Sequence, residues 1–407
     1  MNQDIIIEVL KKWNPWDHRI DSGIKRPHYM RKIFPYLERK EIIVLKGIRR
    51  SGKSTIIKQL MHEMTLKGIN KNQLLYLNLE DYNLTNDLTI NLFNEVLDAY
   101  QQHTKNKKKT YFFIDEVQKI EGWEKWIRTK YDLGENIKFI VSGSSASLLS
   151  KELSTLLTGR NISFKIMPLS FGEYTKFSKT KSLDGYLKYG GFPEVVLEKS
   201  EEKKLTILEQ YFDDILHKDI IDRYKIRNAK QIIELARYIV STAGSKVSIN
   251  KLSNIFGISK DTISLYLGYM VDACLLAEVT YFSYSAKIRH DVTKLSKYYV
   301  LDNGLVNVAS IRFSKNLGQM YENSVLIKLM ENKNEVSYWS EEMAEVDFIA
   351  GNEAINVTAT DHIPLRETIG LSKFKETHKQ FATLLITRTK SDKESMPLIK
   401  FLLRALP

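Results

Sequence analysis

The chain has 407 residues, of which 43% are hydrophobic, so it contains enough apolar residues for the cores of two or three domains and is not disordered. A formal net charge of +12 favours a polyanionic partner. The single cysteine, Cys274, excludes disulfides and cysteine-rich zinc modules. Asp4 and Glu8 near the start do not fit a signal peptide, and no apolar run reaches the roughly 18 residues of a membrane span. We therefore expect a cytoplasmic protein without a membrane segment.

A glycine-rich loop follows the first predicted strand, residues 41–46. The spacing of Gly47, Gly52, Lys53 and Ser54 fits the pattern G-x-x-x-x-G-K-[ST], in which backbone N–H groups and the start of the next helix surround a phosphate. Lys53 is expected to reach the β- and γ-phosphates of ATP, and the Ser54 hydroxyl to bind Mg²⁺. The predicted nucleotide-binding residues are Gly47, Ile48, Arg49, Arg50, Ser51, Gly52, Lys53, Ser54 and Thr55.

Two carboxylates end another predicted strand, residues 110–116, whose apolar run is typical of a parallel strand buried on both faces. Active sites of such sheets lie at the carboxyl ends of the strands. Asp115 is expected to hold Mg²⁺ through water, and Glu116 to polarise the attacking water. The loop and this strand together predict hydrolysis of a nucleoside triphosphate. The alternative is a strand that merely ends in polar residues.

Two later segments supply further candidates. A hydroxyl at the end of the strand 137–142 could sense the γ-phosphate or orient water, and Ser144 is preferred over Ser142; a polar turn that caps the next helix is an equal alternative. Arg160 precedes the strand 162–167 and could complete the site of a neighbouring subunit, although most arginines are surface residues. The predicted catalytic residues are Glu116, Lys53, Ser144 and Arg160.

Five short motifs follow one another along the chain, at residues 47–55, 112–118, 141–145, 157–173 and 189–194. In this order they resemble the motifs of the archaeal-type AAA-like P-loop ATPases that carry a C-terminal domain of unknown function. The resemblance covers nearly the whole chain. It implies a three-layer α/β/α sheet, bound ATP and Mg²⁺, and the ATPase class with an additional strand and a catalytic glutamate. It does not identify a substrate or partner.

Three short helices and two strands are expected between residues 231 and 302, with a turn at Gly257–Ser259 between the last two helices. This order predicts a winged helix that contacts duplex DNA. The candidate DNA contacts are Lys260, Thr262 and Ser264 on the third helix and Lys287, Arg289, His290, Lys294 and Lys297 in the basic wing. The alternative is a protein-binding module, because Tyr266, Tyr269 and Met270 make the third helix unusually apolar.

The order of elements after residue 315 resembles the restriction-endonuclease-like fold. In that fold Glu322, Asp347 and a later Glu-x-Lys would bind metal and activate water. Asn356 and Thr358 occupy the place of the later motif, so one metal-binding carboxylate and the lysine are missing, while Glu345 lies beside Asp347. We therefore expect a degenerate domain that keeps the fold without cutting DNA.

Four segments are predicted from these patterns: a helical lead-in (1–40), an AAA-like ATPase core (41–195), a helical linker with a winged helix (196–310) and the degenerate nuclease-like domain (311–407). The predicted function is a Mg²⁺-dependent ATPase associated with DNA. A nucleotide-controlled switch that binds a protein partner is the main alternative, and a small-molecule kinase is disfavoured because Asp115 and Glu116 favour water as the acceptor. A homo-oligomer is expected if Arg160 acts on a neighbouring subunit.

Overall fold

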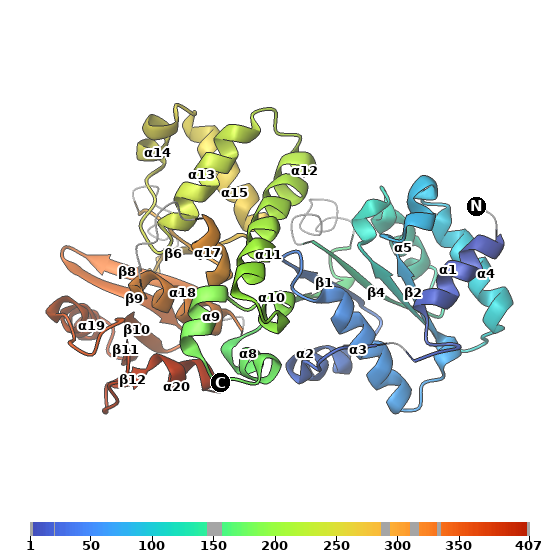
Figure 1. Cartoon of the computed structure of the whole chain (residues 1–407), viewed down its shortest axis with the longest axis horizontal. Helices are drawn as coiled ribbons and strands as arrows, with labels where there is room; N and C mark the ends of the chain where they lie inside the picture. The colour runs from blue at the N-terminus through green and yellow to red at the C-terminus, as the bar shows by residue number, and fades with distance from the viewer. Residues whose placement is uncertain are drawn as a thin grey trace. The chain divides into compact units, whose positions relative to one another are not determined.

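The computed structural model describes residues 3–19, 21–144, 157–285, 294–309, 317–331 and 335–404. The described residues form two compact units, Met1–Ile166 and Met167–Pro407 (Figure 1). The finer division into four segments stays a prediction.

In the described part of the first unit, five strands form one parallel sheet in the order β2-β3-β4-β1-β5. The strands are β1 (Ile42–Gly47), β2 (Leu74–Asn78), β3 (Thr110–Asp115), β4 (Ile137–Ser144) and β5 (Asn161–Lys165). Strand β4 lies between the strand before the glycine loop and the strand with the two carboxylates. The predicted α/β P-loop fold is confirmed.

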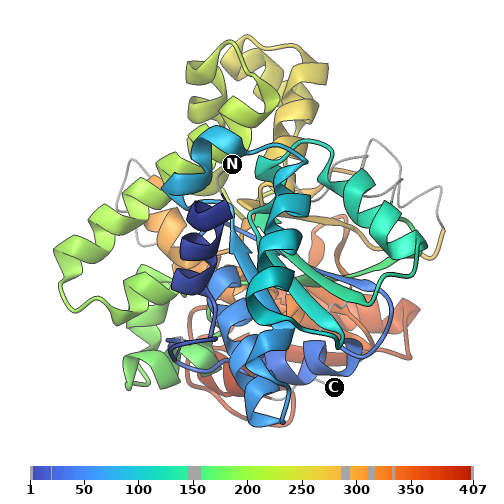
Figure 2. The same cartoon turned by 90° about the vertical axis from the view of Figure 1, so that its right-hand side faces the viewer.

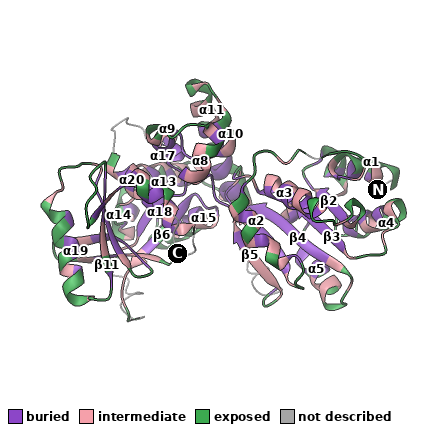
Figure 3. Cartoon of the chain, turned by 90° about the horizontal axis from the view of Figure 1, so that it is seen from below, coloured by how far each residue is buried: buried purple, intermediate pink, exposed green. Residues whose placement is uncertain are grey.

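Helices cover both faces of this sheet (Figure 2). On one face the core is formed with α1 (Gln3–Trp13), α4 (Leu92–Thr104) and α5 (Trp123–Asp132), and on the other with α2 (Pro27–Ile33) and α3 (Lys53–Leu66). Alternate residues of a strand point to opposite faces, so Val44 joins the first core and Ile43 the second. Burial on both faces explains why the strands are almost entirely apolar (Figure 3). Short helical turns lie at η1 (Phe34–Tyr36), η2 (Lys71–Gln73), η3 (Tyr82–Asp87) and η4 (Val117–Lys119).

The lead-in protects the exposed edge of the sheet at β2. The Asn14 side chain accepts a hydrogen bond from Tyr76 N at 2.6 Å and donates one to Tyr76 O at 2.9 Å, as a neighbouring strand would. Trp16 Nε1 donates to Leu74 O at 2.9 Å. Unpaired edge groups invite pairing with other chains, so these side chains close the edge.

In the described part of the second unit, seven strands form a mixed sheet in the order β12-β11-β10-β9-β8-β6-β7. They are β6 (Leu276–Tyr281), β7 (Lys297–Val300), β8 (Val336–Glu341), β9 (Ala344–Ala350), β10 (Glu353–Val357), β11 (Ala382–Thr387) and β12 (Ser395–Pro397). Strand β6 pairs with β7 in antiparallel and with β8 in parallel orientation. The strands expected in the winged helix and those expected in the nuclease-like segment therefore share one sheet.

The described helices of the second unit all lie after residue 166. They are α8 (Phe171–Ser178), α9 (Leu183–Tyr189), α10 (Pro193–Leu197), α11 (Glu201–Asp214), the π-helix η5 (Ile215–Ile221), α12 (Asp222–Tyr224), α13 (Ala229–Ser241), α14 (Ile249–Phe256), α15 (Lys260–Asp272), α17 (Asn303–Ala309), α18 (Leu317–Met330), α19 (Leu365–Thr377) and α20 (Leu398–Leu403).

The two glycines of the motif at residues 189–194 pack against a buried carboxylate, and one of them donates a hydrogen bond to it. Asp302 accepts hydrogen bonds from Gly191 N at 2.7 Å and from Gly304 N at 2.8 Å. Gly190 has φ +71°, and a Cβ on it would lie 1.8 Å from Asp302 Oδ1, so no side chain fits. Burial raises the pKa of Asp302 to about 7, although the backbone donors act against this shift. This motif therefore joins α9 to the start of α17.

Candidate active site

The glycine loop connects β1 to the 14-residue helix α3. Gly52 adopts φ +96°, and a Cβ on Gly47 would lie 2.1 Å from Ile166 O, so both positions require glycine. Arg50 also lies in the left-handed region, at φ +67°. No side chain of the described residues caps the start of α3, which leaves its N–H groups to bind an anion.

Two polar side chains in this loop are buried and incompletely satisfied. Lys53 is 5% exposed, and its Nζ donates long hydrogen bonds to Gly47 O (3.2 Å) and Ile48 O (3.3 Å). The Ser51 hydroxyl is buried and has no hydrogen-bond partner among the described residues. Buried polar groups are normally satisfied, so these atoms fit a phosphate ligand. Ser54 lies at the start of α3, and its role as a Mg²⁺ ligand stays a prediction.

The two predicted carboxylates lie at the carboxyl end of β3. Asp115 is 2% exposed and accepts hydrogen bonds from the Tyr76 hydroxyl, at 2.8 Å, and from the Ser142 hydroxyl. The N–H of Glu116 lies 3.4 Å from Ser142 Oγ. Ser144 is also buried, but β-sheet pairing places it opposite Gly47 at the start of the loop. Ser142 thus contacts the Asp115 carboxylate and Ser144 lies beside the loop, and which of them acts as the sensor stays a prediction.

Glu116 has an unusual backbone and a half-buried side chain. Its φ of +57° lies in the left-handed region, which turns the chain directly after β3. Gln118 Nε2 donates to Glu116 Oε2 at 2.6 Å. Burial raises the pKa of Glu116, and the positive charge of Lys53 acts against this shift. A carboxylate with a raised pKa near the ammonium of Lys53 suits the removal of a proton from water.

Arg160 lies away from this site. Its carbonyl accepts a hydrogen bond from Ile42 N at 2.8 Å, and its Nε lies 2.9 Å from Asp132 Oδ1. Ile42 begins β1 and Gly47 ends it, so at about 3.3 Å per residue Arg160 is roughly 16 Å from the loop, at the opposite edge of the sheet. Arg160 therefore cannot act on the nucleotide of its own chain, and a role in a neighbouring subunit stays a prediction.

Three residues near the site were missed in the sequence. Arg26 is 2% exposed, and its Nη1 donates a hydrogen bond to Ser51 O at 3.0 Å. This hydrogen bond holds the glycine loop in place. Tyr76 holds Asp115, and Gln118 holds Glu116. No local pattern marks Arg26, and Tyr76 reads as an ordinary core residue of a strand. Gln118 lies in a family motif, which was the one available signal.

The predicted DNA-contacting helix is α15. Lys260 and Ser264 are exposed, while Thr262 is partly buried and its hydroxyl lies 2.8 Å from that of Ser259. Leu265 is 51% exposed on the same helix. Tyr266 and Met270 are buried, so the apolar residues that suggested a protein-binding module belong largely to the core.

The basic wing is described only in part. Lys287, Arg289 and His290 lie outside the described residues. Lys294 is exposed, with its Nζ 4.6 Å from the centre of the Tyr281 ring.

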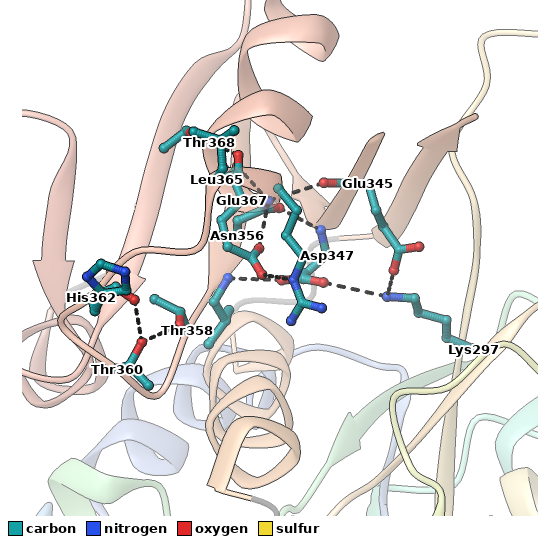
Figure 4. A network of polar contacts seen from close by, with 12 residues as sticks. Lys297, Glu345, Asp347, Asn356, Thr358, Thr360, His362, Leu365, Glu367 and Thr368 are labelled. Carbon is teal, nitrogen blue, oxygen red and sulfur yellow. Dashed lines mark hydrogen bonds and ion pairs between the residues drawn. The ribbon is translucent and has the colours of Figure 1, made fainter. Parts of the chain in front are cut away.

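The prediction that Lys297 contacts DNA is wrong. Its side chain is 3% exposed, and Nζ lies 2.5 Å from Glu345 Oε1 and 3.6 Å from Asp347 Oδ1 (Figure 4). Burial disfavours the charged lysine, but the charges of Asp347, Glu322 and Glu345 outweigh it and raise the pKa of Lys297. The expectation that no lysine accompanies these carboxylates is also wrong, because β7 supplies one from an earlier part of the chain.

Protein groups satisfy the remaining atoms of this cluster. Asn356 Oδ1 accepts from Asp347 N and its Nδ2 donates to Glu367 O, each at 2.9 Å. Asp347 Oδ2 accepts from Val357 N, and Glu322 accepts from the Tyr299 hydroxyl. Asn356 therefore joins neighbouring segments. Thr358, which stands where a lysine was expected, approaches the Thr360 hydroxyl instead. Across the described ranges, no group of three or more His, Cys, Asp or Glu residues is arranged to hold a metal ion.

Comparisons with known proteins agree with this architecture. Residues 39–175 match the family described as an AAA domain, and residues 180–316 match a domain of unknown function (DUF8612). An uncharacterized protein of Methanocaldococcus jannaschii, MJ1544, is 35% identical over 338 residues, which cover 77% of this chain and 73% of that protein. The chain belongs to the AAA-like P-loop ATPase family with a C-terminal domain of unknown function. An uncharacterized protein of Haemophilus influenzae is 32% identical over 381 residues, which cover 89% of this chain and 93% of that protein.

Solved structures resemble this member of the AAA-like ATPase family only distantly. The Aeropyrum pernix ORC1 protein in complex with DNA has 10% sequence identity and a TM-score of 0.34, over 75% of this chain and 94% of that chain. A similarity this weak supports no inference about function. Among the helices of the described ranges, none is both long and apolar enough to cross a membrane.

Proposed function

We propose that the protein binds ATP with Mg²⁺ in the glycine loop and hydrolyses it to ADP and phosphate. The observation that carries this proposal is the combination, at one edge of the sheet, of an incompletely satisfied buried Lys53 and Ser51 with the carboxylates Asp115 and Glu116. A nucleotide-binding scaffold needs the first pair, and hydrolysis needs the second as well.

The residues divide the work as follows. The N–H groups at the start of α3 and the Lys53 ammonium bind the phosphates and stabilise the charge that develops on them. Ser54 and Asp115 would hold Mg²⁺, which neutralises phosphate charge when bound. Tyr76 and Ser142 hold the Asp115 carboxylate in place. Glu116 orients the water and takes its proton.

Phosphate release tests this proposal. Wild type should hydrolyse ATP only with Mg²⁺, and Glu116→Gln should keep ATP affinity while losing roughly 10²-fold or more of the turnover, because an amide cannot take the proton. Glu121→Gln, two residues beyond the η4 turn, is a control for the loss of a nearby charge. Equal turnover in wild type and Glu116→Gln would contradict the assignment.

A second proposal is that α14 and α15 associate with duplex DNA, as the net charge and the exposed Lys260 and Ser264 suggest. The reading as a winged helix is supported by the order of three helices followed by the antiparallel strands β6 and β7. Affinity should weaken with salt, and Lys260→Glu should reduce the slope of log affinity against log salt by about 0.9 per lost phosphate contact. Lys246 is not expected to contact a DNA phosphate, because its Nζ forms an ion pair with Glu345. Absence of binding at low salt would favour the switch that grips a protein partner.

We also propose that the protein self-associates and that Arg160 acts on the nucleotide of a neighbouring subunit. Arg160 lies too far from the loop of its own chain to act there. ATP should promote oligomers in sedimentation experiments, and Arg160→Ala should lower turnover without lowering ATP affinity. A monomer in every nucleotide state, with a fully active Arg160→Ala variant, would contradict this role.

A further inference from the structure

A short turn brings Gln118 back to Glu116. Glu116 ends the strand in a left-handed conformation, φ +57°, and the η4 turn follows at once. Such backbone is costly for a residue with a side chain and persists where the surroundings hold it. The result is the 2.6 Å hydrogen bond from Gln118 Nε2 to Glu116 Oε2. The short turn directly after β3 therefore places the Gln118 side chain against Glu116.

The other end of the Gln118 amide is unused. A carboxylate only accepts hydrogen bonds, so Glu116 requires the N–H end of the amide and turns the carbonyl oxygen away. That oxygen, Gln118 Oε1, is buried and accepts no hydrogen bond from the described residues. Buried acceptors are normally satisfied, so this oxygen points to a donor that arrives with the substrate. Glu116 Oε1 likewise receives no hydrogen bond from the described residues.

We propose that Gln118 is a second catalytic residue of the ATPase site, and that its carbonyl oxygen accepts a hydrogen bond from the attacking water while its N–H holds Glu116. The inference rests on the proposed function. A water whose lone pair faces the γ-phosphorus directs both protons elsewhere, and the two unused oxygens of Glu116 and Gln118 provide two acceptors for them.

The step balances with ATP and water alone. The water oxygen forms a bond to the γ-phosphorus, and the bond from that phosphorus to the oxygen bridging to the β-phosphate breaks. ADP leaves with the electron pair of the broken bond. One water proton passes to Glu116, which later releases it, while the other stays on the phosphate product. Gln118 remains neutral and fixes the direction of the attack.

The test compares Gln118→Leu with wild type in turnover and ATP affinity. Gln118→Leu should lower turnover by about 10-fold to 10²-fold with ATP affinity within about twofold, because the variant loses the acceptor for the attacking water but no contact with the nucleotide. Gln101→Leu is the matched control, since its exposed amide donates to Asn106 O away from the site.

The outcomes separate the two claims. If wild type hydrolyses ATP, Glu116→Gln does not, and Gln118→Leu matches wild type in turnover, the role of Gln118 is overturned and the ATPase stands. If wild type and Glu116→Gln hydrolyse ATP equally, the proposed function fails and this inference fails with it. A lower turnover of Gln118→Leu with unchanged ATP affinity supports the inference.

Discussion

The glycine loop of the first unit and the carboxylate cluster of the second both bury a lysine, but in opposite surroundings. Lys53 donates only long hydrogen bonds to two backbone carbonyls, beside the unpartnered Ser51 hydroxyl. Lys297 lies between Glu345 and Asp347, which are themselves held by other protein groups. A buried cation that the protein leaves incompletely satisfied indicates a ligand site, whereas a fully paired one indicates a structural role.

The two sites also show that a resemblance in the order of elements does not establish the same chemistry. The second unit has carboxylates in an order of elements that resembles a nuclease, yet its lysine neutralises them within the protein (Figure 4). We infer that the first site binds and turns over a ligand, and that the second stabilises the fold. The following predictions test the two sites in parallel.

Removal of Lys297 should have the largest effect. Lys297→Met leaves buried carboxylates without their cation, so the free energy of unfolding should fall by about 3–5 kcal/mol. Urea unfolding measures it, and Lys294→Met, at an exposed lysine just before β7, should stay within about 0.5 kcal/mol of wild type. Equal stability of the two variants would show that the buried ion pairs do not stabilise the second unit.

Removal of Lys53 should instead affect binding. Lys53→Ala should weaken the affinity for Mg²⁺-ATP by about 10-fold or more, because the ammonium contacts the phosphates, while the unfolding free energy changes little. Fluorescent ATP titrations measure the affinity. Lys58→Ala, on the same helix but away from its start, should bind ATP as wild type does. A loss of stability without a loss of affinity would mean that Lys53 resembles Lys297 after all.

The stability of the cluster should depend on pH. Burial and the charge of Asp347 raise the pKa of Glu322 from 4.5 to about 8. The folded state therefore binds more protons than the unfolded state between these values, so the free energy of unfolding should fall as pH rises through this window. Glu322→Gln cannot ionise, so its free energy of unfolding should fall less than that of wild type between pH 5 and 8.5, as measured by urea unfolding. An equally small loss for the exposed Glu376→Gln variant would remove Glu322 as the cause.

The smallest expected effect is on DNA cleavage. Supercoiled DNA incubated with the protein and Mg²⁺ or Mn²⁺, with or without ATP, should stay intact, and Asp347→Ala should change nothing. Each oxygen of the Asp347 carboxylate contacts a protein group, Lys297 Nζ or Val357 N. Neither oxygen is therefore left for a metal ion. Nicking that disappears in Asp347→Ala would show that the cluster opens and catalyses.

Local spacing was enough to find the candidate site of the first unit, whose binding of ATP stays a prediction. The glycine loop, Asp115 and Glu116 depend on residues adjacent in sequence and on the rule that parallel strands end at one edge. The α/β sheet was predicted from apolar runs, which are also local features of the sequence. Lys297 was misassigned because a charge in a basic stretch reads as exposed, and only the pairing of β6 with β8 brings it to Asp347.

Other parts of the site depend on tertiary contacts. Arg26 reaches the loop because the lead-in folds back onto α3, where Gln59 holds it. Arg160 is far from the loop of its own chain because β5 is parallel to β1, so the start of β5 lies at the far edge of the sheet. Such contacts are set by packing between distant segments, which spacing in the sequence does not reveal.

A crystal structure of Glu116→Gln grown with ATP and Mn²⁺ in place of Mg²⁺ compares the two sites most directly, because both lysines and any bound metal are seen together. We predict that Lys53 Nζ leaves the carbonyls of Gly47 and Ile48 for the phosphates, with Mn²⁺ beside Ser54, while Lys297 keeps its contacts with Glu345 and Asp347. Mn²⁺ at Asp347 with a displaced Lys297, or Lys53 still on the two carbonyls and no nucleotide in the loop, would contradict the account.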